Sequence, residues 1–176
     1  AHNRLNALAA IAAARHAGVP VEQACKAIGE FKGIKRRLEV LGEVGGITVY
    51  DDFAHHPTEI IETLSAVKEV SARGRILAVL EPRSNTMRMG VHKKRLLDSL
   101  QQADNIYLFQ PDNIEWNLAD LARHSTAAAG VYDDVDGIIK DVTRQAQPGD
   151  HVVIMSNGGF ESIHTRLLQA LEKQAA

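Results

Sequence analysis

The sequence is poor in the residues and patterns that mark several classes of protein. Cys25 is the only cysteine among 176 residues, which excludes an internal disulfide and a cysteine-based zinc site. We expect this thiol to be a small buried hydrophobe. No apolar run approaches the roughly 18 residues of a membrane-spanning helix, and no signal-like pattern opens the chain. The formal net charge of −2 argues against a general nucleic-acid binder. We therefore expect a cytoplasmic protein without membrane or nucleic-acid partners.

Two further features concern the extent of the chain. No Gly-x-x-x-x-Gly-Lys-Ser/Thr segment occurs, so these residues hold no P-loop. The chain opens at Ala1 within a helical pattern and without an initiator methionine, so we expect a fragment of a longer protein. Hydrophobic residues make up 45% and charged residues 24%, as in ordinary globular domains. The length favours one domain of about 150 residues with a short appendage.

Hydrophobic periodicity predicts two helices followed by a strand–helix alternation. An alanine-rich helix over 3–17 stops at Gly18-Val19-Pro20, a second helix covers 21–31, and a basic linker follows. Gly45-Gly46 then marks the turn of a hairpin. The remaining expected helices lie at 57–71, about 92–102, 118–123, 135–147 and 162–174, and the expected strands at 38–44, 47–50, 75–80, 105–109, near 130–132 and 151–155.

This alternation defines the fold class. Strands separated by helices of ten or more residues require right-handed crossovers and a largely parallel sheet. The continuous apolar runs at 76–80 and 152–155 are typical of strands that are buried on both faces. We predict an α/β, Rossmann-like, largely parallel sheet with helices on both faces and an N-terminal β-hairpin, preceded by a short all-α segment. The domain boundary is expected between 1–34 and 35–176.

Polar loops follow three of the predicted strands. The first loop, Asp51 to Pro57, carries two carboxylates and two histidines before a proline that suits the first position of a helix. The other two loops span 81–90 and 156–160. Ligands of parallel α/β sheets bind at the carboxyl ends of the strands, so we expect the three loops to share one rim. The residues of the first loop leave three interpretations open: a polyanion-contacting loop, a metal site, and a polar turn without a task.

Arginines supply the cations near these loops. Arg36 and Arg37 precede the hairpin, and Arg83 follows a buried strand. A guanidinium group suits phosphate and carboxylate better than an ammonium group does. The alternatives are a solvated basic face for the first two and a structural ion pair for Arg83. The Ser156-Asn157-Gly158-Gly159 segment is either an anion-binding nest or a plain tight turn.

Several of these segments together resemble one enzyme family. Asp51-Asp52-Phe53-Ala54-His55-His56-Pro57-Thr58-Glu59 resembles the Asp-Asp-Tyr-Gly-His-His-Pro-Thr-Glu signature of the Mur ligases that act on UDP-N-acetylmuramate. His2-Asn3-x-x-Asn6 resembles the segment that closes the central ATPase domain of the family, and Arg36-Arg37-Leu38-Glu39 its Arg-Arg-Phe-Asp/Glu element. The resemblance spans the whole chain at the spacing of the family.

Two loops resemble one branch of the family. Glu81-Pro82-Arg83-Ser84-Asn85-Thr86-Met87 and Ser156-Asn157-Gly158-Gly159-Phe160 are similar to the branch that uses the murein tripeptide L-alanyl-γ-D-glutamyl-meso-diaminopimelate. Both segments depart from the branch that adds L-alanine, which otherwise remains the alternative. The resemblance implies ATP- and Mg²⁺-dependent activation of the muramate carboxylate to an acyl phosphate, amide formation with the tripeptide, and a role in peptidoglycan recycling.

The resemblance also implies roles for individual residues, according to their positions in the matching motifs. It places the nucleotide near the first helix and the first polar loop, and the tripeptide between the other two loops. His2, Asn3 and Asn6 would lie at or near adenine, Asp52 would hold the ribose hydroxyls, Arg37 and His55 would approach the phosphates, and Arg83, Ser84, Asn85, Thr86, Ser156 and Asn157 would line the tripeptide pocket.

The same resemblance implies what these residues do not supply. The UDP-binding domain, the P-loop and most Mg²⁺ ligands would belong to upstream parts of the same polypeptide, with 1–34 as the helical tail of the central ATPase domain. We therefore expect the isolated chain to be inactive and to hold no metal site of its own. Two other hypotheses stay open: a regulatory nucleotide-binding module without chemistry, and a metal-dependent phosphohydrolase built on Asp51, Asp52, His55 and His56.

Overall fold

The computed structural model describes residues 2–31, 33–71 and 74–175; the side chains of His2 and Asn3 lie outside that description. The chain forms two compact units, Ala1–Ile34 and Lys35–Ala176, and each is described by itself. That the first unit is the tail of a central ATPase domain stays a prediction. None of the described helices combines the length and the apolar character that crossing a membrane requires.

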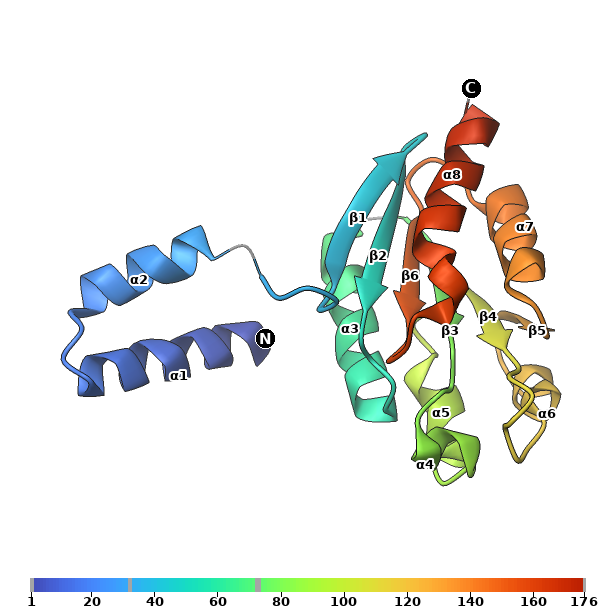
Figure 1. The fold of residues 1–176 in the computed structure, drawn as a ribbon, viewed down its shortest axis with the longest axis horizontal. Helices are drawn as coiled ribbons and strands as arrows, with labels where there is room; N and C mark the ends of the chain where they lie inside the picture. Colours follow the sequence, from blue (N-terminus) through green and yellow to red (C-terminus); the bar gives the residue numbers. More distant parts are fainter. Residues whose placement is uncertain (1, 32, 72–73, 176) are drawn as a thin grey trace. The chain divides into compact units, whose positions relative to one another are not determined.

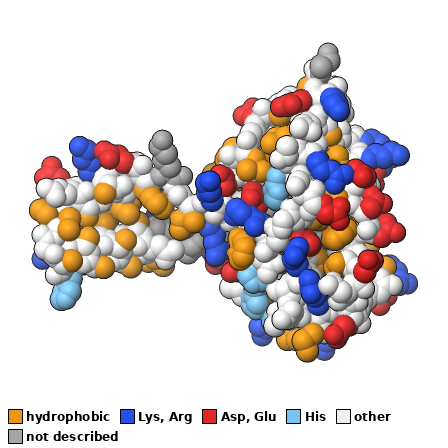
Figure 2. Space-filling model, in the orientation of Figure 1, with side chains coloured by type: hydrophobic (Ala, Val, Ile, Leu, Met, Phe, Trp, Pro, Cys, Tyr) orange, Lys and Arg blue, Asp and Glu red, His pale blue; other side chains and the backbone are white. Residues whose placement is uncertain are grey.

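The first unit is a pair of helices, α1 (His2–His16) and α2 (Val21–Glu30). Gly18 adopts a left-handed φ of 92° between them, and Pro20 precedes α2. The expectation of a buried Cys25 was wrong, because this residue is exposed on α2. Hydrophobic side chains are also prominent on the visible surface of this unit (Figure 2). The large exposed ones are Leu5, Leu8, Val19, Val21, Ile28, Phe31 and Ile34.

The second unit contains a six-stranded sheet in the order β1-β2-β6-β3-β4-β5 (Figure 1). The strands β1 and β2 form the predicted antiparallel hairpin, and all other neighbours are parallel. The predicted fold class is therefore confirmed. The strands are β1 (Glu39–Val44), β2 (Ile47–Asp52), β3 (Ile76–Leu80), β4 (Asn105–Phe109), β5 (Ala128–Tyr132) and β6 (His151–Met155).

Helices cover both faces of this sheet, as the uninterrupted apolar runs predict. In β3, Ile76, Ala78 and Leu80 pack on one side, whereas Leu77 and Val79 pack on the other. The first side is covered by α3 (Pro57–Val70), α4 (Asn85–Arg88), α5 (Lys93–Ser99) and α6 (Leu118–Arg123), and the second by α7 (Val135–Gln145), the short 3-10 helix η1 (Phe160–Ser162) and α8 (Ile163–Ala175) (Figure 1).

Two of the differences from the predicted boundaries bear on the site. The helix expected at about 92–102 is shorter, and α4 precedes it because Gly90, with a φ of 70°, breaks the helical path between them. Strand β2 extends through Asp51 and Asp52, since both residues still pair with β6. Its two carboxylates therefore belong to a buried strand end and not to a solvated loop.

Helix α3 offers a direct test of this packing. Leu64 is fully buried in the core, whereas Ile61 on the same helix is 42% exposed. We expect Leu64→Ala to lower the free energy of unfolding by about 2–5 kcal/mol, because the substitution leaves a cavity. Ile61→Ala, the matched control, should change it by only about 0.5 kcal/mol. Urea-induced unfolding measures both values, and equal losses would contradict the assigned face of the helix.

Candidate functional site

The carboxyl ends of β2, β6 and β3 form one rim. Asp52 and Leu80 both lie opposite Met155 in the parallel register. The Ser156 N–H donates to the Asp52 carbonyl at 3.1 Å, and the Glu81 N–H donates to the Met155 carbonyl at 3.0 Å, so the ladder continues past the strands. The three polar loops therefore leave the sheet side by side, as the strand pattern predicts.

Asp52 holds the first loop together. One carboxylate oxygen accepts from the Ala54 N–H at 2.8 Å and the Thr63 hydroxyl at 3.0 Å, and the other from the Leu38 N–H at 2.6 Å. The residue is only 4% exposed, and burial raises the pKa of Asp52 above its ordinary value of 3.8 despite these donors. Its predicted contact with ribose stays a prediction, and in this structure both oxygens already have protein donors.

Asp51 joins the linker to the rim. Its carboxylate lies 3.1 Å from Arg36 Nε and 3.0 Å from His164 Nε2. Burial alone would raise the pKa of Asp51, but His164 and Arg36 together hold it below its ordinary value of 3.8. Arg36 also donates from Nη2 to the Ser156 carbonyl at 2.6 Å, so one guanidinium bridges the ends of β2 and β6.

Two arginines of the linker lie beside Phe53 of the first loop. The guanidinium groups of Arg36 and Arg37 lie 5.3 and 5.8 Å from the centre of its ring, and the His55 ring meets it edge-on at 5.5 Å. His55 Nδ1 lies 3.0 Å from the Phe53 carbonyl and 3.3 Å from Glu59 Oε2. The Arg37 side chain is 52% exposed and its nearest carboxylate, on Glu59, is 3.9 Å away. Arg37 is thus an accessible cation beside Phe53.

His56 has a structural role at the start of α3. Its Nδ1 accepts a hydrogen bond from the Thr58 N–H at 3.3 Å, which caps the helix in front of Pro57. Its ring also meets that of His92 edge-on, with centroids 4.4 Å apart. Burial, followed by the neighbouring His56 and Arg95, lowers the pKa of His92 below its ordinary value.

The two carboxylates and two histidines of the first loop do not converge. Asp51 faces Arg36 and His164, and Asp52 is held by backbone and Thr63 donors. His55 and His56 contact groups of their own loop and of α3. In the described part of the chain, no three His, Cys, Asp or Glu side chains gather as metal ligands do. The geometry therefore gives no support to the phosphohydrolase hypothesis.

A buried network connects the other two loops. Glu81 is 6% exposed and accepts a hydrogen bond from the hydroxyl of Ser156, which is fully buried. The same hydroxyl accepts from the Gly158 N–H at 2.9 Å. Arg83 Nη1 lies 3.7 Å from Glu81 Oε1, and 48% of the Arg83 side chain is exposed. The predicted ion pair and an accessible cation are thus both present at Arg83.

The remaining predicted pocket residues follow Arg83 and Ser156 directly along the chain. The hydroxyls of Ser84 and Thr86 lie 3.3 Å apart at the start of α4, and Asn85 beside them is exposed. Asn157 Oδ1 is buried and accepts no hydrogen bond from the residues that the structure describes. These groups offer hydroxyl and amide donors and acceptors in the two loops that hold Arg83 and Ser156.

The predicted adenine residues belong to the first unit. Asn6 is exposed on α1. The side chains of His2 and Asn3 lie outside the described residues, and their predicted roles stay predictions.

Comparison with known families identifies the second unit. Residues 36–158 match the family description "Mur ligase, glutamate ligase domain". The chain belongs to the Mur ligase family. A crystal structure of a murein peptide ligase from Psychrobacter arcticus superposes with a TM-score of 0.78 at 48% identity, over 99% of this chain and 38% of that one.

Curated Mur ligases are similar along almost the whole chain. The UDP-N-acetylmuramate–L-alanyl-γ-D-glutamyl-meso-2,6-diaminoheptandioate ligase of Escherichia coli is 52% identical over 175 residues, which are 99% of this chain and 38% of that protein. A UDP-N-acetylmuramate–L-alanine ligase from Jannaschia is 37% identical over 99% of this chain and 39% of that protein. The chain therefore spans less than two fifths of the length of these relatives.

Sequence reasoning missed the supporting residues of this Mur ligase domain. Thr63 lies on α3, 11 residues after Asp52, and His164 lies on α8, more than a hundred residues after Asp51, and no local pattern connects either residue to its carboxylate partner. The role of Glu81 could have been predicted, because an acidic residue directly after a strand that is buried on both faces needs protein groups as partners. Gly158 has no local signal beyond its place in a glycine pair.

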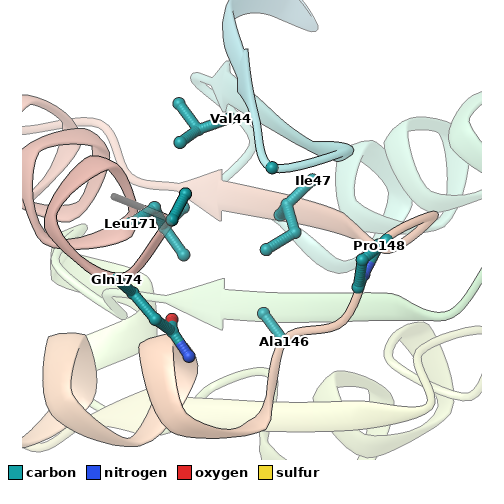
Figure 3. Close-up of a pocket in the computed structure, with 8 residues that line it drawn as sticks. Val44, Ile47, Ala146, Pro148, Leu171 and Gln174 are labelled. Carbon is teal, nitrogen blue, oxygen red and sulfur yellow. The ribbon is translucent and has the colours of Figure 1, made fainter.

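A hollow of about 310 Å³ lies away from this rim, near the amino ends of β2 and β6 (Figure 3). It sits between the turn of the β-hairpin, the segment that precedes β6, and α8. None of its lining residues is titratable, so it offers no charged partner for a phosphate or a carboxylate. The lining residues are Val44, Gly45, Ile47, Ala146, Pro148, Leu171, Gln174 and Ala175.

The Asp51 cluster makes a prediction about pH. Because the folded pKa of Asp51 lies below 3.8, its contribution to stability is present above that value and is lost as the pH falls through the folded pKa. We expect Asp51→Asn to lower the free energy of unfolding at neutral pH by about 1.5–3 kcal/mol, since hydrogen bonds to a charged group are lost. The deficit relative to wild type should shrink as the pH falls below about 4.

Denaturant unfolding at several pH values measures this difference. Asp133, an exposed carboxylate, provides the matched control Asp133→Asn. A deficit for Asp51→Asn that stays constant from neutral to acidic pH would contradict the charge-based explanation.

Proposed function

We propose that this chain is the carboxy-terminal part of an ATP-dependent ligase that joins UDP-N-acetylmuramate to L-alanyl-γ-D-glutamyl-meso-diaminopimelate. In the reaction, the γ-phosphoryl group of ATP passes to the muramate carboxylate and ADP leaves. The amine of the tripeptide then attacks the acyl phosphate, so that an amide bond forms and phosphate and a proton are released. The proposal includes a cytoplasmic location and a role in peptidoglycan recycling.

The observation that carries the proposal is the pair of loops after β3 and β6. Their sequences resemble the tripeptide-using branch, and the structure brings them together through Glu81 and Ser156. The higher identity to ligases named for this tripeptide than to L-alanine ligases supports the same choice. The alternative, a ligase for L-alanine, shares the nucleotide-facing loop and differs at these two loops.

The surface around Phe53, with Arg37 and His55, fits an anionic nucleotide. Arg37 is half exposed and only weakly engaged by Glu59, so its guanidinium group remains available for a phosphate. His55 lies beside it against Phe53. In our proposal both residues stabilise negative charge on the transferred phosphoryl group. Mg²⁺ would supply further charge neutralisation there, and we assign its ligands to upstream parts of the polypeptide.

The loop after β3, which carries Arg83, fits a peptide that has several carboxylates. Arg83 is an exposed cation on this side of the rim, and buried Glu81 lies beside it as one fixed neighbour. A carboxylate is the natural partner for its remaining donors. The nearby Ser84, Asn85, Thr86 and Asn157 supply neutral polar contacts, and L-alanine has no second carboxylate for such a site.

The first unit fits the proposed longer protein. Its two helices expose large apolar side chains, among them Leu5 and Leu8 at 65% and 62% (Figure 2). Apolar surface of this kind is characteristic of segments that pack against further structure. We assign it to the central ATPase domain, with Asn6 toward adenine.

Two substitutions in the full-length enzyme separate the roles of the loops. We expect Arg83→Ala to raise the KM for the tripeptide about 10- to 100-fold, because a charge-assisted hydrogen bond contributes roughly 1.5–3 kcal/mol. Arg37→Ala should chiefly impair ATP use, with a loss of similar size. Initial rates over both substrate concentrations give the answer, and equal effects of each variant on both substrates would refute the division.

The amine substrate decides between the two branches. We expect the full-length enzyme to release phosphate with the tripeptide and at most marginally with L-alanine. The opposite preference would favour the L-alanine ligase. The isolated chain should be inactive with either amine, and ATP-dependent ligation by it would refute the assignment of upstream catalytic parts.

A further inference from the structure

Gly158 makes an unusually close approach to Arg83. A Cβ atom on Gly158 would lie 2.5 Å from both Cδ and Nη1 of Arg83 and 2.7 Å from its Nε. Contacts below about 3 Å are sterically forbidden, so any side chain at this position would have to displace the guanidinium group. We call the loop after β6, residues 156–160, the wall, because Arg83 lies against its Gly158.

The backbone does not require glycine at this position. Gly158 is absent from the glycines with left-handed φ, and an L-residue could adopt its conformation. The neighbouring Gly159 also has an ordinary φ of −81°, and a Cβ there would meet nothing within 4 Å. For an added Cβ atom, the two glycines differ in the space that Gly158 leaves for Arg83.

Buried groups fix the wall in place. The Ser156 hydroxyl accepts from the Gly158 N–H and donates to Glu81, and the other oxygen of Glu81 lies 3.7 Å from Arg83 Nη1. Ser156 is fully buried and Glu81 is 6% exposed, so both ends of this network are shielded from water. The Glu81 carboxylate thus fixes the position of the wall through Ser156 and also attracts the Arg83 guanidinium group.

We propose that Gly158 is a specificity-determining position, and that Glu81 and Ser156 are positioning residues, for the carboxylate-binding orientation of Arg83. A free arginine side chain samples many rotamers, and a wall with one fixed anionic neighbour removes most of them. The long contact to Glu81 leaves most of the guanidinium donors for a carboxylate of the amine substrate. This inference rests on the proposed function.

The two glycines give a matched test in the full-length enzyme. Gly158→Ala should raise the KM for the tripeptide about 10- to 100-fold and leave the KM for ATP within about twofold, as displacement of Arg83 predicts. Gly159→Ala should leave both constants unchanged. Equal behaviour of the two variants, or an equal effect of Gly158→Ala on ATP, would overturn the proposal.

A double variant tests whether Gly158 acts through Arg83. In an Arg83→Ala background, Gly158→Ala should change the KM for the tripeptide less than about twofold, because the displaced group is already absent. A full additional loss would overturn the proposal. If Gly158→Ala alone fails to fold, Glu81→Gln provides the second measurement. It should raise the KM for the tripeptide and not that for ATP, and an unchanged tripeptide KM would overturn the positioning role.

Failure of the proposed function would look different. In that case the wild-type enzyme would itself fail to use the tripeptide in the amine-substrate assay. A wild type that uses the tripeptide, combined with indistinguishable Gly158→Ala and Gly159→Ala variants, would overturn this inference alone.

Discussion

The parallel pairing of β2, β6 and β3 is the constraint on which the site depends. It places Asp52, Met155 and Leu80 at one level, so that the loops that follow them start within hydrogen-bonding reach of each other. Arg36 then closes the arrangement from the side, because its guanidinium group contacts both Asp51 and the Ser156 carbonyl. A change at the end of one strand therefore alters the positions of the loops that follow the other two strands.

Burial decides which charges of the rim remain available. Asp51, Asp52 and Glu81 are each less than 10% exposed and are compensated by donors or cations of the protein. Arg37 and Arg83 are about half exposed and make only long contacts with carboxylates, at 3.9 and 3.7 Å. Since these three carboxylates are engaged by protein groups whereas the guanidinium groups of Arg37 and Arg83 keep free donors, these two arginines present positive charge to ligands although the chain is slightly acidic.

The sequence predicts local structure better than contacts between distant residues. The hairpin at Gly45-Gly46 and the helix start at Pro57 follow from short-range rules and are confirmed. Cys25 was predicted to be buried from its residue type, but it lies on the exposed surface of a two-helix unit. The network of Glu81 and Gly158 spans two loops more than seventy residues apart, and no periodicity records such a contact. That Glu81 needs a partner can be inferred from the sequence, but the partner itself can be recognised only when the strand order is known.

The turn after the Gly158 loop explains why that loop can act as a rigid wall. Residues 160–162 are not glycines, yet their φ values are 43°, 47° and 57°, a conformation that costs an L-residue roughly 1–2 kcal/mol. Such a turn persists only where its surroundings hold it. Phe160 is 1% exposed and packs against Phe109, with ring centroids 5.5 Å apart, so a buried anchor follows the loop directly. Because the loop is fixed by the sheet on one side and by Phe160 on the other, Gly158 cannot retreat from Arg83, and a substituted side chain would move the arginine instead of the loop.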